Sequence, residues 1–522
     1  MTPPGSVWHV AREYAGLAEA GGVKDVVRGL AESLARKGIP TTVVLPLYGF
    51  AAREVDRQKP VASFTVSLPD HDRENRFFDE TVRVFQEQIE GVRLLFVDSP
   101  RYAALRDVYT YTARDEAENH YRKKGTGHWD SHQLNVLLQK AALEASAREG
   151  APAAIFHCHD GHTSFLPALM REVAAYSDRF RSSSPVVTIH NAGRGYHQEV
   201  WSAEFASLLT GLPEAVLQKG LLEGMVDPLL LAGSYALLST VSEQYARELL
   251  AEKEGEMSGG LGRTCHDRGI PIVGITNGID PTPWDPRNPR QSGLPFGFDP
   301  STGDLEGKRK CRQALEARLG LPGKDGASDT PLFAFVGRLT EQKGVDVLFG
   351  SLKEILARES SPLFVVLGTG EKAKEDVFSW LAGRPETRGR LCFVPRYDPA
   401  LAKLIFAASD FFLIPSAYEP CGLTDFISQI LGSIPVVHRV GGLVKVKDGV
   451  TGFSYVEQSP AALSAVLEKT ARMFASEPAA LGNMRKRAFQ EIFSDHTWDR
   501  VLQEGYLPLY ERAMKEAAWT RR

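Results

Sequence analysis

The strongest constraint on the fold of this 522-residue chain is an alternation of short apolar runs with helical stretches, which starts again in the second half. In the first half the apolar runs are rich in Val, Ile and Leu, and segments such as 24–37 have helical spacing. Such runs are typical of parallel strands buried on both faces of a sheet. Strands are predicted at 6–10, 41–46, 92–98, 154–159 and 186–190.

Residues 285–308 are dense in Pro, Gly, Asp and Asn, which is typical of a linker. Beyond them the pattern resumes with a predicted helix at 344–358 and helix-rich segments at 461–474 and from 498 onward. We therefore predict an α/β fold with two Rossmann-like, doubly wound domains, 1–285 and 286–522, facing a deep cleft. Strands of the second domain are predicted at 332–337, 363–367, 391–394, 411–414 and 435–438.

Composition narrows the possible partners. A formal charge of −4 gives no basic face for nucleic acid, and the longest apolar candidate, 229–241, is too short for a membrane helix and contains Gly and Ser. The N-terminus lacks the pattern of a signal peptide, and the five cysteines show no paired spacing. We expect a soluble cytoplasmic protein without a nucleic-acid or membrane partner.

Two motifs of the first half follow predicted strands. Residues 21–25 (Gly-Gly-Val-Lys-Asp) open a helix, where free N–H groups suit a diphosphate, although paired glycines before a helix are often only structural. Residues 157–162 (His-Cys-His-Asp-Gly-His) end a strand, and alternation sends His157 and His159 to one face. A metal site, buried hydrogen-bonded polar residues, and a substrate contact through His162 are the three interpretations.

Two motifs of the second half carry charge at strand ends. Residues 337–344 (Gly-Arg-Leu-Thr-Glu-Gln-Lys-Gly) place two cations on a loop, which suits a leaving phosphate, with a solvated basic loop as the alternative. Residues 415–424 (Pro-Ser-Ala-Tyr-Glu-Pro-Cys-Gly-Leu-Thr) put a carboxylate on a tight turn before another helix, whose free N–H groups suit a phosphate. A helix cap without function is the alternative there.

Taken together, these motifs resemble the bacterial glycogen synthase and plant starch synthase family. The likeness is ordered along nearly the whole chain and is weakest at 50–140. Residues 19–26 look like K-T-G-G-L-A-D-V and 157–162 like H-A-H-D-W-H. The remaining matching segments are 188–191 (T-I-H-N), 275–280 (I-L-N-G-I-D), 338–344 (R-L-T-x-Q-K-G), 368–370 (G-T-G), 419–424 (E-P-C-G-L-T) and 441–443 (T-G-G-L).

The resemblance implies a GT-B glycosyltransferase that moves glucose, with retention, from ADP-glucose to the non-reducing end of an α-1,4-glucan such as glycogen. It implies an acceptor-side N-terminal domain, a nucleotide-sugar-binding C-terminal domain, and a last helix that packs back on the N-terminal domain. No metal or other cofactor is implied. Departure of the leaving group and attack on the same face is the expected route, because the family lacks the flanking nucleophilic carboxylate of a retaining glycosidase.

The family's functional residues carry over by position. Arg338 and Lys343 would neutralise the leaving diphosphate, Glu419 would hold the glucose hydroxyls, and His162 would contact the glucose. Tyr397 lies where the family stacks adenine. The other expected donor-site residues are Gly21, Gly22, Asp25, Gly422, Leu423 and Thr424, with His190 and Asn191 in support.

Several positions depart from the family pattern. Glu19 replaces a Lys near the donor phosphates, which reverses a charge, and Lys24 is a candidate to compensate. Gly161 replaces a Trp and is expected to leave room beside His162. The other departures are 226–229 for N/S-F-L-K, Asp425 for Gln, 444–447 (Val-Lys-Val-Lys) for A-D-T-V, and Pro508 inside the last helix.

Two other functions remain open from the sequence. One keeps the fold but uses UDP-glucose or another sugar acceptor, and donor competition separates it from the first. The other is a non-catalytic glucan-binding homologue, favoured by Glu19 and opposed by the retained Arg338, Lys343 and Glu419. The preferred acceptor length and the oligomeric state are not encoded in any motif.

Overall fold

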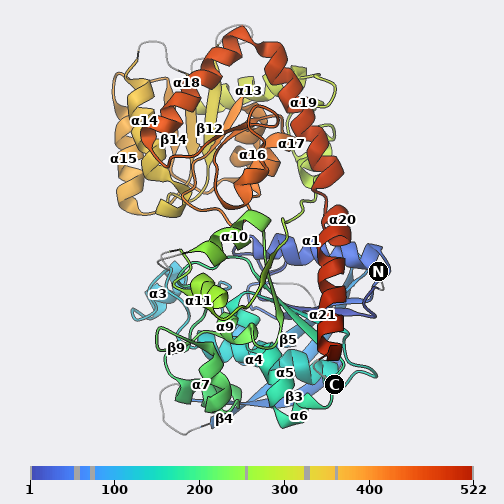
Figure 1. The fold of residues 1–522 in the computed structure, drawn as a ribbon. Helices are drawn as coiled ribbons and strands as arrows, with labels where there is room; N and C mark the ends of the chain where they lie inside the picture. Colours follow the sequence, from blue (N-terminus) through green and yellow to red (C-terminus); the bar gives the residue numbers. More distant parts are fainter. Residues whose placement is uncertain are drawn as a thin grey trace. The chain divides into compact units, whose positions relative to one another are not determined.

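The computed structural model describes residues 3–51, 59–70, 77–252, 257–321, 330–358 and 362–519. The chain forms two compact units, one of Met1–Gly278 with Trp498–Arg522, and one of Ile279–Thr497 (Figure 1). The stretch 285–308, which its composition predicts to be a linker, lies within the second unit. Its Phe298 is buried in that unit's core. Among the described residues, no helix is long and apolar enough to cross a membrane.

The first unit is built on a nine-stranded sheet in the order β11-β10-β7-β6-β1-β2-β5-β4-β3. Strands β3 and β4 pair antiparallel and the rest of the sheet is parallel, apart from the β4–β5 pair. The order of the parallel strands reverses between β1 and β6, which makes their carboxyl ends the expected ligand site of a doubly wound sheet. The bounds are β1 Val7–Val10, β2 Thr41–Pro46, β3 Ala62–Pro69, β4 Phe77–Ile89, β5 Val92–Asp98, β6 Ile155–His159, β7 Ser184–Ile189, β10 Leu237–Thr240 and β11 Ile272–Gly274.

The central strands β1, β2, β6 and β7 are buried at every position, as expected for a sheet covered on both faces. Alternate residues enter different cores: Trp8 and Val10 pack into one cluster, whereas Val7 packs into another. The apolar segment 229–241 is divided between a buried helix and strand β10. Helices of this unit include α1 Val23–Arg36, α4 Ser131–Ala147, α5 Leu166–Glu172, α7 Ala203–Thr210, α9 Pro228–Ala232, α10 Glu243–Ala251 and α11 Leu261–Asp267.

The C-terminal segment belongs to the first unit. It comprises α20 Trp498–Val501, a π-helical turn Leu502–Tyr506 and α21 Leu507–Trp519. Trp498 packs against α1, where a Cβ on Gly29 would lie 2.1 Å from the indole Nε1, so only glycine fits there. Pro508 cannot donate to the preceding turn, and a π-helical turn, in which the Leu507 N–H bonds the Leu502 carbonyl, lies immediately before it.

The second unit contains a six-stranded parallel sheet in the order β14-β13-β12-β15-β16-β17, whose switch point lies between β12 and β15. Residues of β12 alternate between two cores: Leu332 and Ala334 pack with α13 and α16, whereas Phe333 and Phe335 pack with α14 and α18. The strands are β12 Leu332–Val336, β13 Leu363–Leu367, β14 Leu391–Val394, β15 Phe411–Ile414, β16 Ile434–His438 and β17 Phe453–Tyr455. The main helices are α13 Glu306–Leu319, α14 Val345–Leu356, α15 Lys372–Gly383, α16 Pro399–Ala408, α17 Thr424–Ile430, α18 Pro460–Ser476 and α19 Pro478–Asp495.

Candidate active site

The loop from β1 to α1 is held by the carboxylate of Glu13, which belongs to none of the predicted motifs. Glu13 is buried, and its Oε2 accepts hydrogen bonds from the N–H groups of Ala20 at 2.9 Å and Gly21 at 2.6 Å. The Tyr109 hydroxyl donates to its other oxygen at 2.8 Å. The prediction that residues 21–25 present free N–H groups is therefore wrong at Gly21, because a side chain of the same unit already occupies that donor.

Glu19 and Lys24 both have partners within the same loop. The Glu19 carboxylate accepts from the N–H of Gly16 at 2.7 Å, and the side chain is exposed. Lys24 pairs with Asp25 in the first turn of α1 at 3.2 Å, and burial raises the pKa of that Asp25 carboxyl. The Glu19 carboxylate thus bonds the backbone of the turn that it belongs to. The Lys24 ammonium group, which was expected to compensate for the reversed charge, pairs with Asp25 instead.

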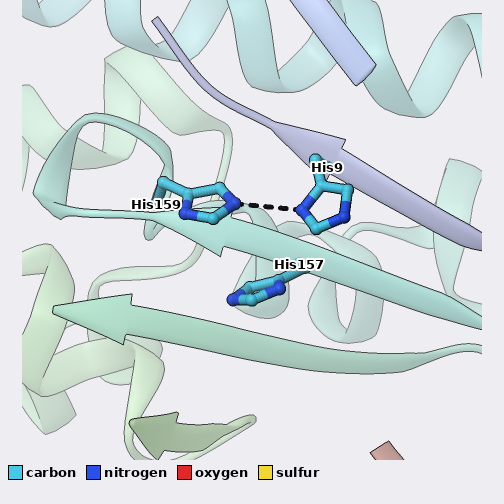
Figure 2. Close-up of side chains that lie close together, drawn as sticks. All are labelled: His9, His157 and His159. Carbon is cyan, nitrogen blue, oxygen red and sulfur yellow. Dashed lines mark hydrogen bonds between the residues drawn. The ribbon is translucent and has the colours of Figure 1, made fainter. Parts of the chain in front are cut away.

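Four histidines form a buried row at the carboxyl end of the sheet, three of which are drawn in Figure 2. His9 on β1 contacts His159 on β6 through Nδ1 and Nε2 at 3.1 Å, and His159 contacts His190 at 3.0 Å. His157 stacks on His159 with centroids 4.4 Å apart, so the predicted common face is confirmed. Burial lowers the pKa of His9 and of His190 to about 3, so the row is neutral at physiological pH.

Two groups of side chains bring potential metal-ligating atoms within 4.8 Å of one another. They are His9, His157 and His159, and His197, Glu199 and Asp227. In the first group His157 bonds the Tyr510 hydroxyl at 2.8 Å and Thr188 at 2.7 Å, so both of its ring nitrogens have protein partners. The hydrogen bonds support the interpretation of motif 157–162 as buried, mutually bonded polar residues.

The turn after β6 is backbone-strained. Asp160 has φ 58° and ψ 178°, and it lies at the β1–β6 switch point. Its Oδ1 accepts from the N–H of His190 at 2.7 Å, and the N–H of Asn191 also bonds its carboxylate. Burial raises the pKa of Asp160 to about 7 against these hydrogen bonds. Asp160 therefore ties the turn after β6 to the start of the 190–191 segment.

His162 is buried and stacks on Tyr109 with ring centroids 4.6 Å apart. Burial, followed by the positive charge of Arg12, holds the pKa of His162 well below its usual value. The expected room beside it is filled: a Cβ on Gly161 would lie 1.9 Å from the carbonyl oxygen of His197. Glycine is needed here because another loop crosses at this point, so the prediction of added space is wrong.

That crossing loop is held by a buried ion pair. His197 Nδ1 lies 2.7 Å from Asp227, and both side chains are almost fully buried. Burial alone would lower the pKa of His197, but the hydrogen bond and charge of Asp227 raise it to about 9. Asp227 also caps α9 by accepting from Leu229 and Leu230. The departure at 226–229 thus creates an internal anchor for the loop over Gly161.

Several residues at this edge were missed as site candidates. Arg12 is buried and donates to Tyr48, to Asn135 and to the Val108 carbonyl, the last at 2.6 Å. A sequence signal existed, because Arg12 and Glu13 are adjacent charges immediately after an apolar strand. Tyr109 carried no such signal, since only the tertiary fold brings it to His162.

In the second unit, the structure brings together two of the predicted residues. Lys343 follows β12 and Glu419 follows β15, so they flank the switch point. Their Nζ and Oε2 atoms are 2.6 Å apart, and Ser416 donates to the same oxygen at 2.8 Å. Burial would raise the pKa of Glu419, but Lys343 and Ser416 outweigh it and lower the pKa, so Glu419 is a carboxylate.

The remaining predicted residues of this unit lie on turns and loops. Gly422 has φ 76°, Leu423 is the N-cap of α17, and Thr424 is its first residue. Arg338 is exposed, and its guanidinium lies 3.4 Å from the Gln342 side chain. The Tyr397 ring, on the loop after β14, is 88% exposed, which leaves its faces open to solvent. These residues surround the carboxyl edge of the sheet rather than forming one bonded cluster.

Comparisons with known proteins agree with this arrangement. A family model described as the starch synthase catalytic domain matches residues 6–264, and one described as glycosyl transferases group 1 matches residues 322–483. Glycogen synthases of Streptococcus agalactiae and Aeromonas hydrophila are 32% and 31% identical to the chain. These matches cover 97% and 98% of the chain, and 99% of each relative.

Solved structures show the same similarity. The catalytic domain of starch synthase IV from Arabidopsis thaliana, bound to ADP and acarbose, superposes with a TM-score of 0.80 at 26% identity. That match covers 98% of this chain and all of the other. A sucrose-phosphate synthase from Thermosynechococcus elongatus shares the fold at a TM-score of 0.55 and 16% identity.

Two Rossmann-like units with motifs at both switch points define a glycosyltransferase of the GT-B class. Within that class, the chain belongs to the glycogen synthase and starch synthase family, whose members are retaining glycosyltransferases.

Proposed function

We propose that this protein transfers glucose from ADP-glucose to the non-reducing end of an α-1,4-glucan, with retention at the anomeric carbon. The observation that carries the proposal is the pair formed by Lys343 and Glu419 at the switch point of the second sheet. A cation and an ionised carboxylate held together at a ligand-binding edge suit a substrate with both a diphosphate and sugar hydroxyls.

In the proposed reaction, Lys343 and Arg338 neutralise the charge that grows on the departing diphosphate. Arg338 is exposed, so its guanidinium is free to turn toward a phosphate. Glu419 accepts hydrogen bonds from glucose hydroxyls, and Lys343 keeps it ionised for that role. The acceptor hydroxyl then attacks on the face from which the diphosphate leaves.

The nucleotide would lie on the turns of the second unit. The N–H groups of Gly422, Leu423 and Thr424 would contact phosphate, and Tyr397 would stack on the base. Because Tyr397 is 88% exposed, a base can stack on its ring without displacing other protein side chains. Residues 286–522 therefore supply most of the proposed donor site.

The first unit would supply the acceptor side and part of the sugar site. His162 is neutral, so it would contact the glucose as a hydrogen-bonding imidazole. His190 and Asn191 would support it, because Asp160 fixes their backbone. Gly21, Gly22 and Asp25 would approach the donor at the start of α1, although the Gly21 N–H bonds Glu13 in the structure described here.

ADP rather than UDP is proposed as the leaving nucleotide because the starch synthase of similar fold is bound to ADP. The five cysteines are free thiols, which supports work in the reducing cytoplasm. No metal is assigned a part in the reaction.

The test is glucose transfer to glycogen with ADP-glucose and UDP-glucose supplied separately, while release of each nucleotide is followed. We expect strong release of ADP and much weaker release of UDP. Activity with UDP-glucose alone would keep the chemistry and change the donor. Release of neither nucleotide, with glycogen or a maltooligosaccharide as acceptor, would contradict the proposed reaction.

A further inference from the structure

Two departures from the family pattern, which lie apart in the sequence, meet in the second unit. Lys445 Nζ is 3.1 Å from Asp425 Oδ1, and the two side chains are 9% and 0% exposed. Asp425 lies in the first turn of α17, directly after the turn 419–424. Lys445 ends the 3₁₀ turn Gly441–Lys445. The residues that replace the family's Gln and Asp are therefore in contact and form a buried ion pair.

The Lys445 ammonium also joins two turns that contain glycine, the turn 419–424 and the 3₁₀ turn Gly441–Lys445. It donates hydrogen bonds to the carbonyl oxygens of Cys421, of Gly422 at 2.9 Å and of Gly442 at 3.1 Å. The turns are packed closely here, since a Cβ on Gly442 would lie 2.0 Å from the Cys421 oxygen. In a trans peptide the N–H points opposite to the carbonyl, so the N–H groups of Gly422 and Leu423 point away from Lys445.

The pair also changes the local charge. The family's Gln and Asp carry a net negative charge, whereas Asp425 and Lys445 sum to zero. Both lie close to the residues proposed to contact the diphosphate, and Lys445 is one of the cations that act on Glu419. A less negative surrounding favours an anionic ligand, most of all where water is excluded.

We propose that Lys445, held by Asp425, is a positioning residue for the nucleotide diphosphate. It fixes both turns through their carbonyl oxygens, and at the first turn this directs the opposite N–H groups, those of Gly422 and Leu423, toward the phosphates. At the second turn the N–H groups of Gly442 and Leu443 bond the carbonyl oxygens of Glu419 and Val440, so that turn supports the first. The pair also removes the negative charge of the family's two residues. The inference rests on the proposed function, because it requires a nucleoside diphosphate at this edge. Lys445 donates its hydrogen bonds to carbonyl oxygens of the protein, so it affects the ligand through the turns.

The test measures ADP binding by calorimetry, and donor and acceptor KM separately, for four variants. Lys445→Met removes the charge at similar volume, Lys445→Asp and Asp425→Gln each break the pair, and the double variant Asp425→Gln/Lys445→Asp restores the family's residues. We expect at least tenfold weaker ADP binding and a matching rise in donor KM for both Lys445 variants. Acceptor KM should stay within twofold, and the double variant, which lacks the ammonium group and regains the negative charge, should bind ADP at least as weakly as Lys445→Met.

The matched control is Lys447→Met. Lys447 lies in the same four-residue departure, but its side chain is 57% exposed and pairs with Glu491 at 2.8 Å. ADP binding there should not change. Circular dichroism identifies variants that are folded, and the double variant supplies the comparison if Lys445→Asp is not.

Equal ADP binding by folded Lys445→Met, Lys447→Met and unaltered protein would overturn the inference alone. So would a folded double variant that binds ADP as tightly as the unaltered protein, because the ammonium group would then not be needed. Failure of the unaltered protein to bind ADP would instead refute the proposed function.

Discussion

The two units hold their glycine turns with opposite charges. In the first, the Glu13 carboxylate accepts from the backbone N–H groups of Ala20 and Gly21. In the second, the Lys445 ammonium donates to the carbonyl oxygens of Cys421, Gly422 and Gly442. Similar glycine-rich sequences before helices thus have different uses. The first turn, whose N–H groups already bond a carboxylate, offers fewer donors to phosphate than the turn 421–423, where Lys445 bonds the carbonyl oxygens instead.

The same contrast applies to the side chains around the turns. The first unit uses a row of neutral histidines, while the second sets lysines against carboxylates at 2.6 Å and 3.1 Å. In the proposed reaction, the charge that stabilises the leaving diphosphate therefore comes from the second unit. The first unit is suited to directional, neutral hydrogen bonds with sugar hydroxyls.

Removal of Lys343, at the switch point of the second unit's sheet, should have the largest effect on turnover. Lys343→Ala should lower kcat by about a hundredfold or more, as loss of one charge-stabilising donor typically does. The control is Lys353→Ala, an exposed lysine on α14. Steady-state rates with saturating donor and glycogen measure the effect. A near-normal kcat would remove Lys343 from the mechanism and weaken the assignment of leaving-group charge to this unit.

Loss of the carboxylate that holds the first turn should chiefly affect stability. Glu13→Gln keeps the size of the side chain but replaces a charged acceptor of three hydrogen bonds by an amide. We expect the free energy of unfolding to fall by about 2–3 kcal/mol. Chemical denaturation measures it, with Glu116→Gln as the control, because that side chain is 38% exposed and its pair with Lys123 contributes little. Equal stability of the two variants would show that Glu13 does not hold the turn.

The smallest effect on stability and on donor KM is expected for Glu19→Lys, at the position where the charge is reversed relative to the family. Because Glu19 is exposed and bonds the N–H of Gly16, Glu19→Lys should change the free energy of unfolding by less than about 1 kcal/mol. The apparent KM for the donor should change by less than about threefold. A tenfold tighter KM would mean that residue 19 does face the diphosphate, and the first unit would then share in binding its charge.

The alternation of apolar and helical segments was sufficient to predict the doubly wound class and the central strands of both sheets, but no strand was predicted at β3, β4, β10, β11 or β17. Runs such as 41–46 and 411–414 became strands because a fully buried parallel strand requires continuous apolar residues. Local composition was less reliable at 285–308, where Pro and Gly suggested a linker. Burial of Phe298 places that stretch in the second unit's core, which is a tertiary effect that composition does not contain.

The candidate site was predictable where a motif carries its own chemistry, as at Lys343 and Glu419. Their contact was not, because it depends on strands far apart in the sequence that become neighbours in the sheet. At Gly161 the sequence led to a wrong prediction. Glycine in place of the family's Trp suggested free space beside His162, but the His197 carbonyl oxygen occupies that space.

The sequence by itself thus determined the central strands, the doubly wound class and the residue types at each switch point, because strand burial and turn chemistry are local. Only the tertiary structure decided which donors and acceptors are already in use. Glu13 reaches Gly21, Asp227 reaches His197, and Lys445 reaches Asp425 across loops whose spacing carries no signal of contact. Charge pairing acts through space, and the fold alone sets those distances.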